Sequence, residues 1–348
     1  MRIGDVEIGA GRRPFVIAEM SGNHDGQLER ALRIVDVAAD SGAQAVKLQT
    51  YTADTMTLDS DANGFVVDEP DSLWYGRKLY DLYDEAHTPW EWHAPIMQHA
   101  KDRGILCFSS PFDSTAVEFL EDLGVPCFKI ASLENVDHPL IQAVAATGKP
   151  VIISTGASNE EEIDEAVQVA RDAGCRDLVL LKCTSGYPTP PEESNLLTIP
   201  YLKSRFGCEV GFSDHTMGIG VAVAAVALGA TVIEKHVTDD RSAGGVDSAF
   251  SSEPHELARL VEEADRGRRS LGSIVLEPTE AERGARIRKR SVYIAKNISA
   301  GDVLTAENLR RIRPGHGLHP KHYVELLGRR VNRDVKAGTP MAWDLLQD

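Results

Sequence analysis

Short apolar runs rich in β-branched residues alternate with longer stretches of helical periodicity along most of the chain. Residues 28–42 and 160–174 have the spacing of amphipathic helices, and each ends in a glycine, a common helix stop, just before the next apolar run. The apolar runs that predict strands are residues 14–20, 45–51, 106–112, 127–132, 150–156, 177–185, 209–216 and 231–238.

Eight strands alternating with helices predict a parallel sheet, and a last helix near 254–271 predicts that the sheet closes into a (β/α)8 (TIM) barrel. An open doubly wound sheet is the alternative, but no GxGxxG turn follows the first strand. The stretch 52–90 is long for a barrel loop, and long loops on this face usually build the substrate site. Its aromatic residues are Phe65, Trp74, Tyr75, Tyr80, Tyr83 and Trp90.

The pattern changes after residue 272, so we expect the catalytic barrel to cover residues 1–272. Residues 273–290 are polar and cationic and predict a linker. Residues 291–348 contain short apolar runs broken by turns, which predict a small β-rich domain.

Charge is distributed unevenly along the chain. The net charge is −16, yet residues 283–333 hold 13 Lys and Arg against 3 Asp and Glu, a local +10. Because no nucleic-acid-binding motif accompanies this region, we expect no nucleic-acid partner. A basic domain that docks on an acidic one, or that faces an anionic substrate, explains the asymmetry better.

The cysteines and the apolar stretches of the sequence indicate the cellular compartment in which the protein functions. Five scattered cysteines without a CxxC pair favour reduced thiols over disulfides or a structural zinc cage. The N-terminus does not resemble a signal peptide, and no apolar run approaches the ~18 residues of a membrane span. We therefore expect a soluble, cytoplasmic protein with no membrane association.

Polar side chains fall at the carboxyl ends of all eight predicted strands, where barrel enzymes carry their catalytic groups. Lys129 lies between apolar neighbours, a costly place for a charge unless it meets an anion or a carboxylate. The strand-end residues, in chain order, are Glu19, Lys47, Gln49, Ser109, Ser110, Lys129, Ser132, Ser154, Thr155, Lys182, Thr184, Ser185, Ser213, Asp214, His215, Glu234, Lys235 and His236.

His215 and His236 end neighbouring strands, which lie about 4.8 Å apart, so the two imidazoles can share one metal ion. Two protein ligands leave open positions for water and substrate, as a Lewis-acid site requires. The serine hydroxyls, together with Lys47 and Lys129, can hold a phosphate and a carboxylate. Two alternatives remain open: an aldolase that forms a Schiff base through Lys129 or Lys182, and a non-catalytic sugar-binding module.

Several of these segments together resemble the sialic acid synthase family. The tail RRIRPGHGLHP resembles the antifreeze-like (SAF) domain that follows the barrel in that family. The barrel segments that carry the resemblance are VIAEMSGNHDG, KLQTYTADTM, FSSPFD, FKIASLEN, STGAS, KCTSGYPTP, GFSDHTMGIG and EKHVTDD.

Within the family, residues 51–93 and 242–250, and Ser185 where neuraminate synthases usually carry Asn, most resemble the subgroup that makes pseudaminic acid. The resemblance implies that phosphoenolpyruvate condenses with 2,4-diacetamido-2,4,6-trideoxy-L-altrose, releasing phosphate and forming a nine-carbon sugar acid. Neuraminate and legionaminate synthases, which use other N-acetylated amino sugars, are the alternative.

The resemblance also implies roles for individual residues. His215 and His236 would bind a divalent cation, Mn²⁺ or else Mg²⁺ or Co²⁺, and Glu19 or Glu134 would manage protons. The chain would form a domain-swapped homodimer. Phosphoenolpyruvate would contact Lys47, Ser110, Lys129, Ser132, Ser154, Ser185 and Ser213. The sugar would contact Glu19, Gln49, Glu134, Tyr187, Asp247 and, from the cap of the other subunit, Arg313.

Overall fold

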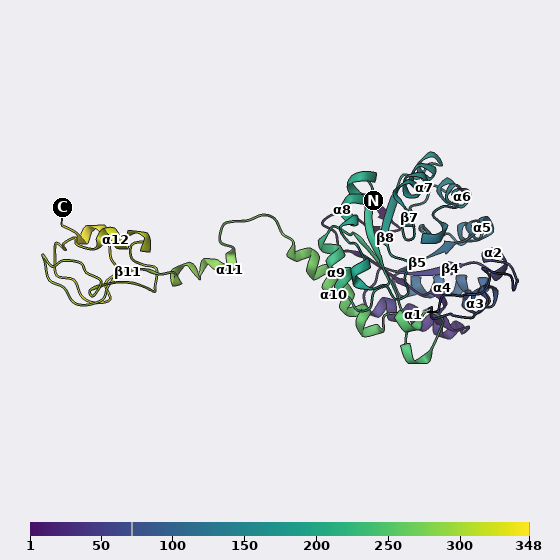
Figure 1. The fold of residues 1–348 in the computed structure, drawn as a ribbon, viewed down its shortest axis with the longest axis horizontal. Coiled ribbons are helices and arrows are strands. Elements are labelled where there is room, and N and C mark those ends of the chain that lie inside the picture. Colours follow the sequence, from purple (N-terminus) through teal and green to yellow (C-terminus); the bar gives the residue numbers. More distant parts are fainter. Residues whose placement is uncertain (71, 348) are drawn as a thin grey trace. The chain divides into compact units, whose positions relative to one another are not determined.

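Eight parallel strands close into a barrel in the first part of the chain, as the sequence predicts (Figure 1). The computed structural model describes residues 1–70 and 72–347. The last strand pairs with the first, and this pairing closes the sheet. The strands are β3 (Phe15–Glu19), β4 (Ala45–Thr50), β5 (Leu106–Pro111), β6 (Phe128–Ile130), β7 (Val151–Ser154), β8 (Leu178–Cys183), β9 (Glu209–Asp214) and β10 (Val232–His236).

Helices connect the strands and form the outer layer of the barrel (Figure 1). The start of α7 follows from its sequence: the Asn159 side chain accepts a hydrogen bond from the Glu162 amide, and the Glu162 carboxylate accepts one from the Asn159 amide. The helices are α1 (Leu28–Asp40), α4 (Trp90–Asp102), α5 (Ser114–Asp122), α6 (His138–Ala146), α7 (Glu160–Asp172), α8 (Thr198–Phe206), α9 (Gly220–Ala227) and α10 (Pro254–Ser270). The helices predicted at 28–42, 160–174 and 254–271 are thus confirmed.

All the barrel strands end one or two residues earlier than the sequence predicts, and after three of them this places a predicted site residue outside the sheet. Ser132 lies in a short 3-10 turn beyond β6, and Ser185 and His215 lie in the loops after β8 and β9. In these places the chain leaves the sheet while its sequence remains apolar or hydroxyl-rich, so composition alone extends the strand.

The barrel interior below the polar strand ends is filled by apolar side chains. Phe15 and Phe108 lie on the same strand faces as Glu19 and Ser110, because alternate residues of a strand point to the same side. A Cβ added to Gly211 would lie 2.6 Å from a Leu181 methyl carbon. The close packing therefore requires glycine there, and the polar groups rest on a solid apolar floor.

The insert at 52–90 carries two short helices, α2 (Ala53–Met56) and α3 (Leu79–Ala86). An isolated antiparallel bridge joins Val66 and Lys78 within it.

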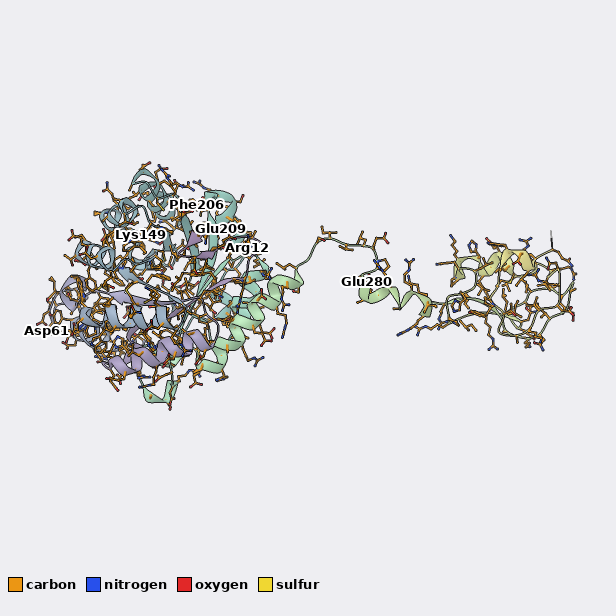
Figure 2. All side chains as sticks on the ribbon, turned by 180° about the vertical axis from the view of Figure 1, so that it is seen from behind. Arg12, Asp61, Lys149, Phe206, Glu209 and Glu280 are labelled. Carbon is orange, nitrogen blue, oxygen red and sulfur yellow. The ribbon has the colours of Figure 1, made fainter. Side chains whose placement is uncertain are left out.

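The chain divides into two units, Met1–Leu271 and Gly272–Asp348, and the second has a core of its own. In the stretch that we expect to be a linker, short turns include α11 (Glu280–Arg283), and its side chains are exposed (Figure 2). Beyond it, β11 (Ser291–Ile294) pairs antiparallel with β12 (Leu309–Ile312), and α12 (Tyr323–Leu326) packs on the same small core.

None of the helices in the described part of the chain is long and apolar enough to cross a bilayer.

Candidate active site

Four buried charged side chains meet inside the barrel at the carboxyl ends of the strands. Lys47 Nζ lies 2.5 Å from a carboxylate oxygen of Glu19 and 3.9 Å from one of Glu234. Lys129 Nζ lies 3.3 Å from the other carboxylate oxygen of Glu234. Each side chain is no more than 6% exposed. Two positive and two negative charges therefore balance one another away from bulk water.

Burial and neighbouring charges shift the four pKa values in different directions. Burial raises the pKa of Glu19 even though Lys47 opposes it, and burial lowers the pKa of Lys129 although Glu234 opposes that shift. The neighbouring lysines outweigh burial and lower the pKa of Glu234, whereas the carboxylates outweigh burial and raise the pKa of Lys47. Glu19 is therefore the carboxylate in this cluster that is best suited to accept and return a proton.

Two of the predicted serines form hydrogen bonds with this charge cluster. Ser110 Oγ accepts a hydrogen bond from Lys47 Nζ at 3.3 Å, and Ser213 Oγ donates one to Glu234 at 3.1 Å. The hydroxyl oxygens of Ser154 and Ser185 are buried, and among the described residues neither has a hydrogen-bond partner. Unused buried hydroxyls at the same end of the barrel as two buried lysines suit the oxygens of a phosphate or a carboxylate.

Gly156 allows Ser132 and Ser185 to approach the same stretch of backbone. The Gly156 amide donates a hydrogen bond to Ser132 Oγ at 3.1 Å. A Cβ at residue 156 would collide with the hydroxyl oxygens of both serines. Glycine therefore keeps the two hydroxyls together at this side of the cluster.

The two predicted histidines lie side by side at the mouth of the barrel, with ring centroids 5.3 Å apart. His215 Nδ1 lies 3.0 Å from the Thr184 carbonyl oxygen and donates to it, so Nε2 is the ring nitrogen available to a metal ion once it has lost its proton. Burial lowers the pKa of His236 well below its ordinary value of 6.5, and its Nδ1 is buried without a hydrogen-bond partner among the described residues. Neutral imidazole is the form that binds a metal ion.

The histidine pair fits a divalent cation as an incomplete protein ligand set. Within residues 1–70 and 72–347, no group of three or more His, Cys, Asp or Glu side chains is arranged to hold a metal ion. Two imidazoles would therefore leave most coordination positions to water and substrate, which is the arrangement of a Lewis-acid site rather than a closed structural one.

Cys183 is a member of the site that the sequence treats only as one of five scattered thiols. Its Sγ lies 3.8 Å from His215 Nδ1, and its side chain is buried. Burial alone would raise the pKa of Cys183, but the hydrogen bond and charge of His215 outweigh it and lower that pKa to about 7. The same contact raises the pKa of His215 despite burial. Alternation along β8 could have placed Cys183 in the interior from the sequence, because Cys183 lies two residues after Leu181 and on the same inward face of the strand.

Other polar strand-end residues point away from the barrel interior. Lys182 Nζ donates to the Cys183 carbonyl at 2.6 Å and to Thr184 Oγ1 at 2.9 Å. Ser109 shares a 2.6 Å hydrogen bond with Thr50 on the outer face of the sheet. Of the two lysines considered for a Schiff base, only Lys129 lies within the charge cluster.

Residues of the first unit that are expected to contact the sugar lie beside the charge cluster. Gln49 Nε2 donates to Glu19 at 2.9 Å and to Ser21 Oγ at 3.3 Å, and Ser21 in turn donates to Asp247. Burial raises the pKa of Asp247 and also that of Glu134, which ends the 3-10 turn after β6. Arg313 belongs to the second unit, where it lines a cavity of about 750 Å³ together with several other basic residues.

Three aromatic rings form one side of the site, and we call Trp74, Tyr187 and Phe250 the aromatic wall. The Tyr187 ring lies 4.5 Å from the His215 ring, 5.3 Å from Phe250 and 6.0 Å from Trp74, measured between centroids. Trp74 comes from the 52–90 insert, and its indole N–H donates to the Val246 carbonyl at 3.2 Å. The insert therefore reaches the rim of the site, as the sequence predicts for a long loop on this face.

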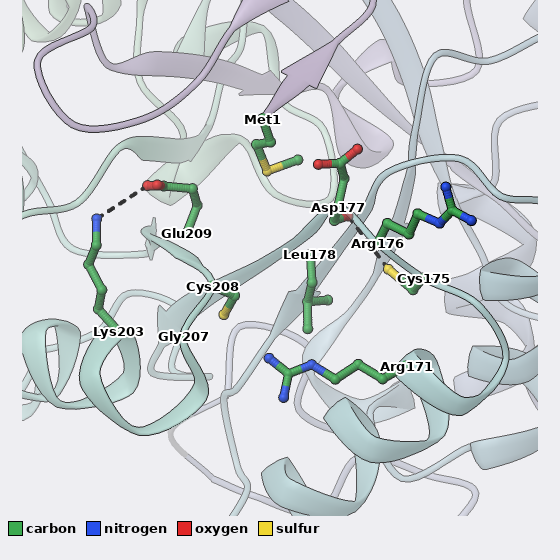
Figure 3. A pocket seen from close by; sticks show the side chains of 10 residues that line it. All are labelled: Met1, Arg171, Cys175, Arg176, Asp177, Leu178, Lys203, Gly207, Cys208 and Glu209. Carbon is green, nitrogen blue, oxygen red and sulfur yellow. Dashed lines mark hydrogen bonds and ion pairs between the residues drawn. The ribbon is translucent and has the colours of Figure 1, made fainter.

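A cavity of about 400 Å³ lies at the opposite end of the barrel, where Leu178 begins β8 and Glu209 begins β9 (Figure 3). Its polar groups include Arg171 and an ion pair of Lys203 with Glu209 at 3.4 Å. Catalytic groups of barrel enzymes gather at the carboxyl ends of the strands, so this cavity is not the candidate site.

Comparison with known proteins agrees with this combination of barrel, site and second unit. Residues 34–275 match the NeuB family and residues 289–347 match the SAF domain. The chain therefore belongs to the NeuB family of enzymes, and the resemblance to sialic acid synthases is confirmed.

Individual relatives narrow the comparison. The chain is 44% identical over 338 residues to the pseudaminic acid synthase of Campylobacter jejuni, covering 97% of each protein, and 40% identical to that of Helicobacter pylori, covering 95% of this chain and 97% of the other. A solved N-acetylneuraminic acid (sialic acid) synthetase of Leptospira borgpetersenii superimposes with a TM-score of 0.73 at 35% identity, covering 82% of this chain and 94% of that one.

Proposed function

We propose that this chain condenses phosphoenolpyruvate with 2,4-diacetamido-2,4,6-trideoxy-L-altrose, releases phosphate and forms pseudaminic acid in a metal-dependent reaction. The observation that carries the proposal is the charge cluster of Glu19, Lys47, Lys129 and Glu234 beside unused hydroxyls and a histidine pair. Its agreement with relatives that are pseudaminic acid synthases over nearly their whole length supports the choice of product.

Phosphoenolpyruvate is the anionic substrate that the lysines suit. Lys47 and Lys129 would neutralise its phosphate and carboxylate, and hydroxyls would donate to the remaining oxygens. The hydroxyls of Ser154 and Ser185, which have no hydrogen-bond partner in residues 1–70 and 72–347, can serve this purpose. The other hydroxyl donors are Ser110, Ser132 and Ser213.

His215 and His236 would hold the divalent cation, Mn²⁺ or else Mg²⁺ or Co²⁺, which polarises the aldehyde of the open-chain sugar when it is bound. C3 of phosphoenolpyruvate attacks that aldehyde carbon and forms the new C–C bond. A water molecule adds to C2, and the C–O bond to phosphate then breaks, so inorganic phosphate leaves. Glu19, whose pKa is raised by burial, accepts one proton of the water and passes it to the former aldehyde oxygen, which becomes a hydroxyl. The second proton of the water leaves with the phosphate as C2 becomes a ketone.

The aromatic wall supports a sugar with an apolar end. An open-chain trideoxyhexose carries a C6 methyl group, which gains from contact with an apolar surface more than a hydroxymethyl group does. Tyr187 lies next to His215, and Trp74 lies one ring farther from the histidines. The aldehyde carbon therefore faces the histidines while the far end of the chain reaches Trp74.

The second unit would act on the barrel of a partner subunit in a homodimer. The excess of positive charge in residues 283–333 against the acidic remainder favours such docking. Arg313 has a planar donor fork that suits an amide carbonyl or a carboxylate. The five free cysteines are consistent with a reaction that takes place in the cytoplasm.

The test is phosphate release from phosphoenolpyruvate with a panel of N-acetylated amino sugars. We expect the highest kcat/KM with the 2,4-diacetamido-2,4,6-trideoxy sugar. Lys129→Met should abolish release, whereas Lys203→Met, which changes a half-exposed surface lysine, should not. A higher kcat/KM with N-acetylmannosamine would refute the substrate, and covalent trapping of substrate by borohydride would refute the mechanism in favour of a Schiff base.

A complementation test addresses the dimer. Chains carrying His236→Ala and chains carrying Arg313→Ala are each expected to be inactive, and they are mixed under conditions that exchange subunits. If the second unit acts on the partner's barrel, one site of each mixed dimer is intact and activity returns. Absence of any recovery, with mixed dimers present by mass spectrometry, would contradict action across the dimer.

A further inference from the structure

A buried cluster of polar side chains on the outer face of the barrel joins the backbone segments that carry the two histidines. Lys235 Nζ lies 2.8 Å from an Asp214 carboxylate oxygen and donates to the Thr216 carbonyl at 2.6 Å. The other Asp214 oxygen accepts from the Thr216 amide at 2.9 Å and from the Thr216 hydroxyl at 2.8 Å. All three residues are at most 2% exposed. We call these three residues the outer cluster.

The residues of the outer cluster are direct sequence neighbours of the two histidines. Asp214 and Thr216 flank His215 on both sides, and Lys235 precedes His236. Asp214 and Lys235 are also direct partners in the β9–β10 register. Because neighbouring residues of a strand point to opposite faces, fixing Lys235 against Asp214 outside the barrel fixes His236 inside it.

We propose that Asp214, Thr216 and Lys235 are positioning residues that set the separation and orientation of the histidine pair for a divalent cation. The inference rests on the metal role of His215 and His236 in the proposed function. The chain bends out of β9 at His215, so alternation within a strand does not orient that ring. The Thr184 carbonyl holds the ring through Nδ1, and the outer cluster adds a second constraint because it ties the backbone on both sides of His215 to β10.

Stability alone does not account for a charge pair in this place. Replacing a buried ion pair by apolar groups of similar size is often neutral or stabilising, and the surrounding outer face of the barrel is apolar. A pair that also holds two neighbouring ligands in one geometry has a different reason to be there, since metal affinity depends on how well the ligands and the groups behind them are oriented.

A comparable polar group on the other side of the barrel provides a matched control. Thr50 Oγ1 lies 2.8 Å from His93 Nε2 and 2.6 Å from Ser109 Oγ. All three residues are buried, Thr50 and Ser109 on the outer face of β4 and β5 and His93 on α4. Thr50 also follows an inward-facing site residue, Gln49. Thr50→Val therefore disturbs an equally buried outer group without touching the histidine pair.

The experiment measures Mn²⁺ binding to the full chain by the electron paramagnetic resonance signal of free Mn²⁺, together with the thermal midpoint of unfolding. Lys235→Met should weaken Mn²⁺ binding at least tenfold, while Thr50→Val should leave the Kd within twofold of the unsubstituted chain. Phosphoenolpyruvate binding in the absence of metal should be retained by both variants. An unchanged Kd for Lys235→Met overturns the inference.

If Lys235→Met does not fold, a second variant tests the same inference. Thr216→Val removes only the hydroxyl hydrogen bond to Asp214 and should weaken Mn²⁺ binding about threefold. An unchanged Kd in this variant overturns the inference just as well. Failure of the metal role in the proposed function is distinguishable, because the unsubstituted chain itself would then bind no Mn²⁺, and failure of the proposed sugar substrate would leave the Mn²⁺ Kd of all variants as expected here.

Discussion

Lys47→Met is the substitution whose effect the structure defines most sharply. Methionine keeps much of the volume of the side chain but removes the ammonium that lies 2.5 Å from Glu19 and 3.9 Å from Glu234. Removing one partner of a buried ion pair leaves an uncompensated charge and costs about 3–5 kcal/mol. Glu234 keeps Lys129 and Ser213, so most of this cost falls on Glu19.

Two measurements follow from this substitution. Thermal unfolding should shift down by about 6–10 °C, since roughly 1 kcal/mol corresponds to about 2 °C in a unit of the size of Met1–Leu271. The KM for phosphoenolpyruvate should rise about 10-fold to 150-fold, since hydrogen bonds to charged groups contribute about 1.5–3 kcal/mol. The KM for the amino sugar, which is neutral, should change much less.

The double variant Lys47→Met with Glu19→Gln separates the two effects. With both charges removed, most of the unfolding free energy should return because no unpaired carboxylate remains. Binding of phosphoenolpyruvate should not return, because the cation is still absent. Lys203→Met serves as the surface control and should shift unfolding very little. If Lys47→Met unfolds at the temperature of the unsubstituted chain and keeps its KM for phosphoenolpyruvate, the reasoning about the charge cluster is wrong.

Three further predictions follow from the site. Trp74→Ala should lower the preference for the 6-deoxy sugar over its 6-hydroxy analogue by about tenfold in kcat/KM, since one methyl group in an apolar contact is worth about 1–3 kcal/mol; exposed Tyr75→Ala is the control and should leave the preference unchanged. Alkylation of Cys183 in metal-free protein should increase with pH and reach half its maximum near pH 7, because the thiolate is the reactive form, whereas burial raises the pKa of Cys107 to about 12 and should keep that thiol unreactive. Removal of divalent metal with EDTA should abolish phosphate release and Mn²⁺ should restore it; full activity after exhaustive chelation would refute the metal role.

The sequence predicts the barrel because each strand and each helix has a clear period of its own. It also predicts that polar residues gather at one end, since parallel strands all finish on the same side of a barrel. Lys47, Lys129 and Glu234 could be assigned to the interior from alternation within their strands. Their contacts with one another in the structure agree with that assignment.

Alternation fails where the chain leaves the sheet. Ser132, Ser185 and His215 lie beyond the last strand residues, so nothing in their spacing fixes where their side chains point. Contacts between distant segments are equally hidden, and the hydrogen bond of Trp74 to the Val246 carbonyl joins residues 172 positions apart. Such contacts depend on the path of whole loops, which single-sequence patterns do not specify.

The two faces of β9 and β10 are best understood together. A strand end that presents His236 to the interior must present its neighbour Lys235 to the outer layer, where an unpaired ammonium would be costly. Asp214 resolves that cost from the adjacent strand, and in doing so it ties together the two segments that carry the histidines. Asp214, which pairs with a buried ammonium on the outside of the barrel, thereby also affects the placement of the histidines on the inside. The polar strand ends are for this reason two coupled layers, one that we propose contacts substrate and one that holds the first in place.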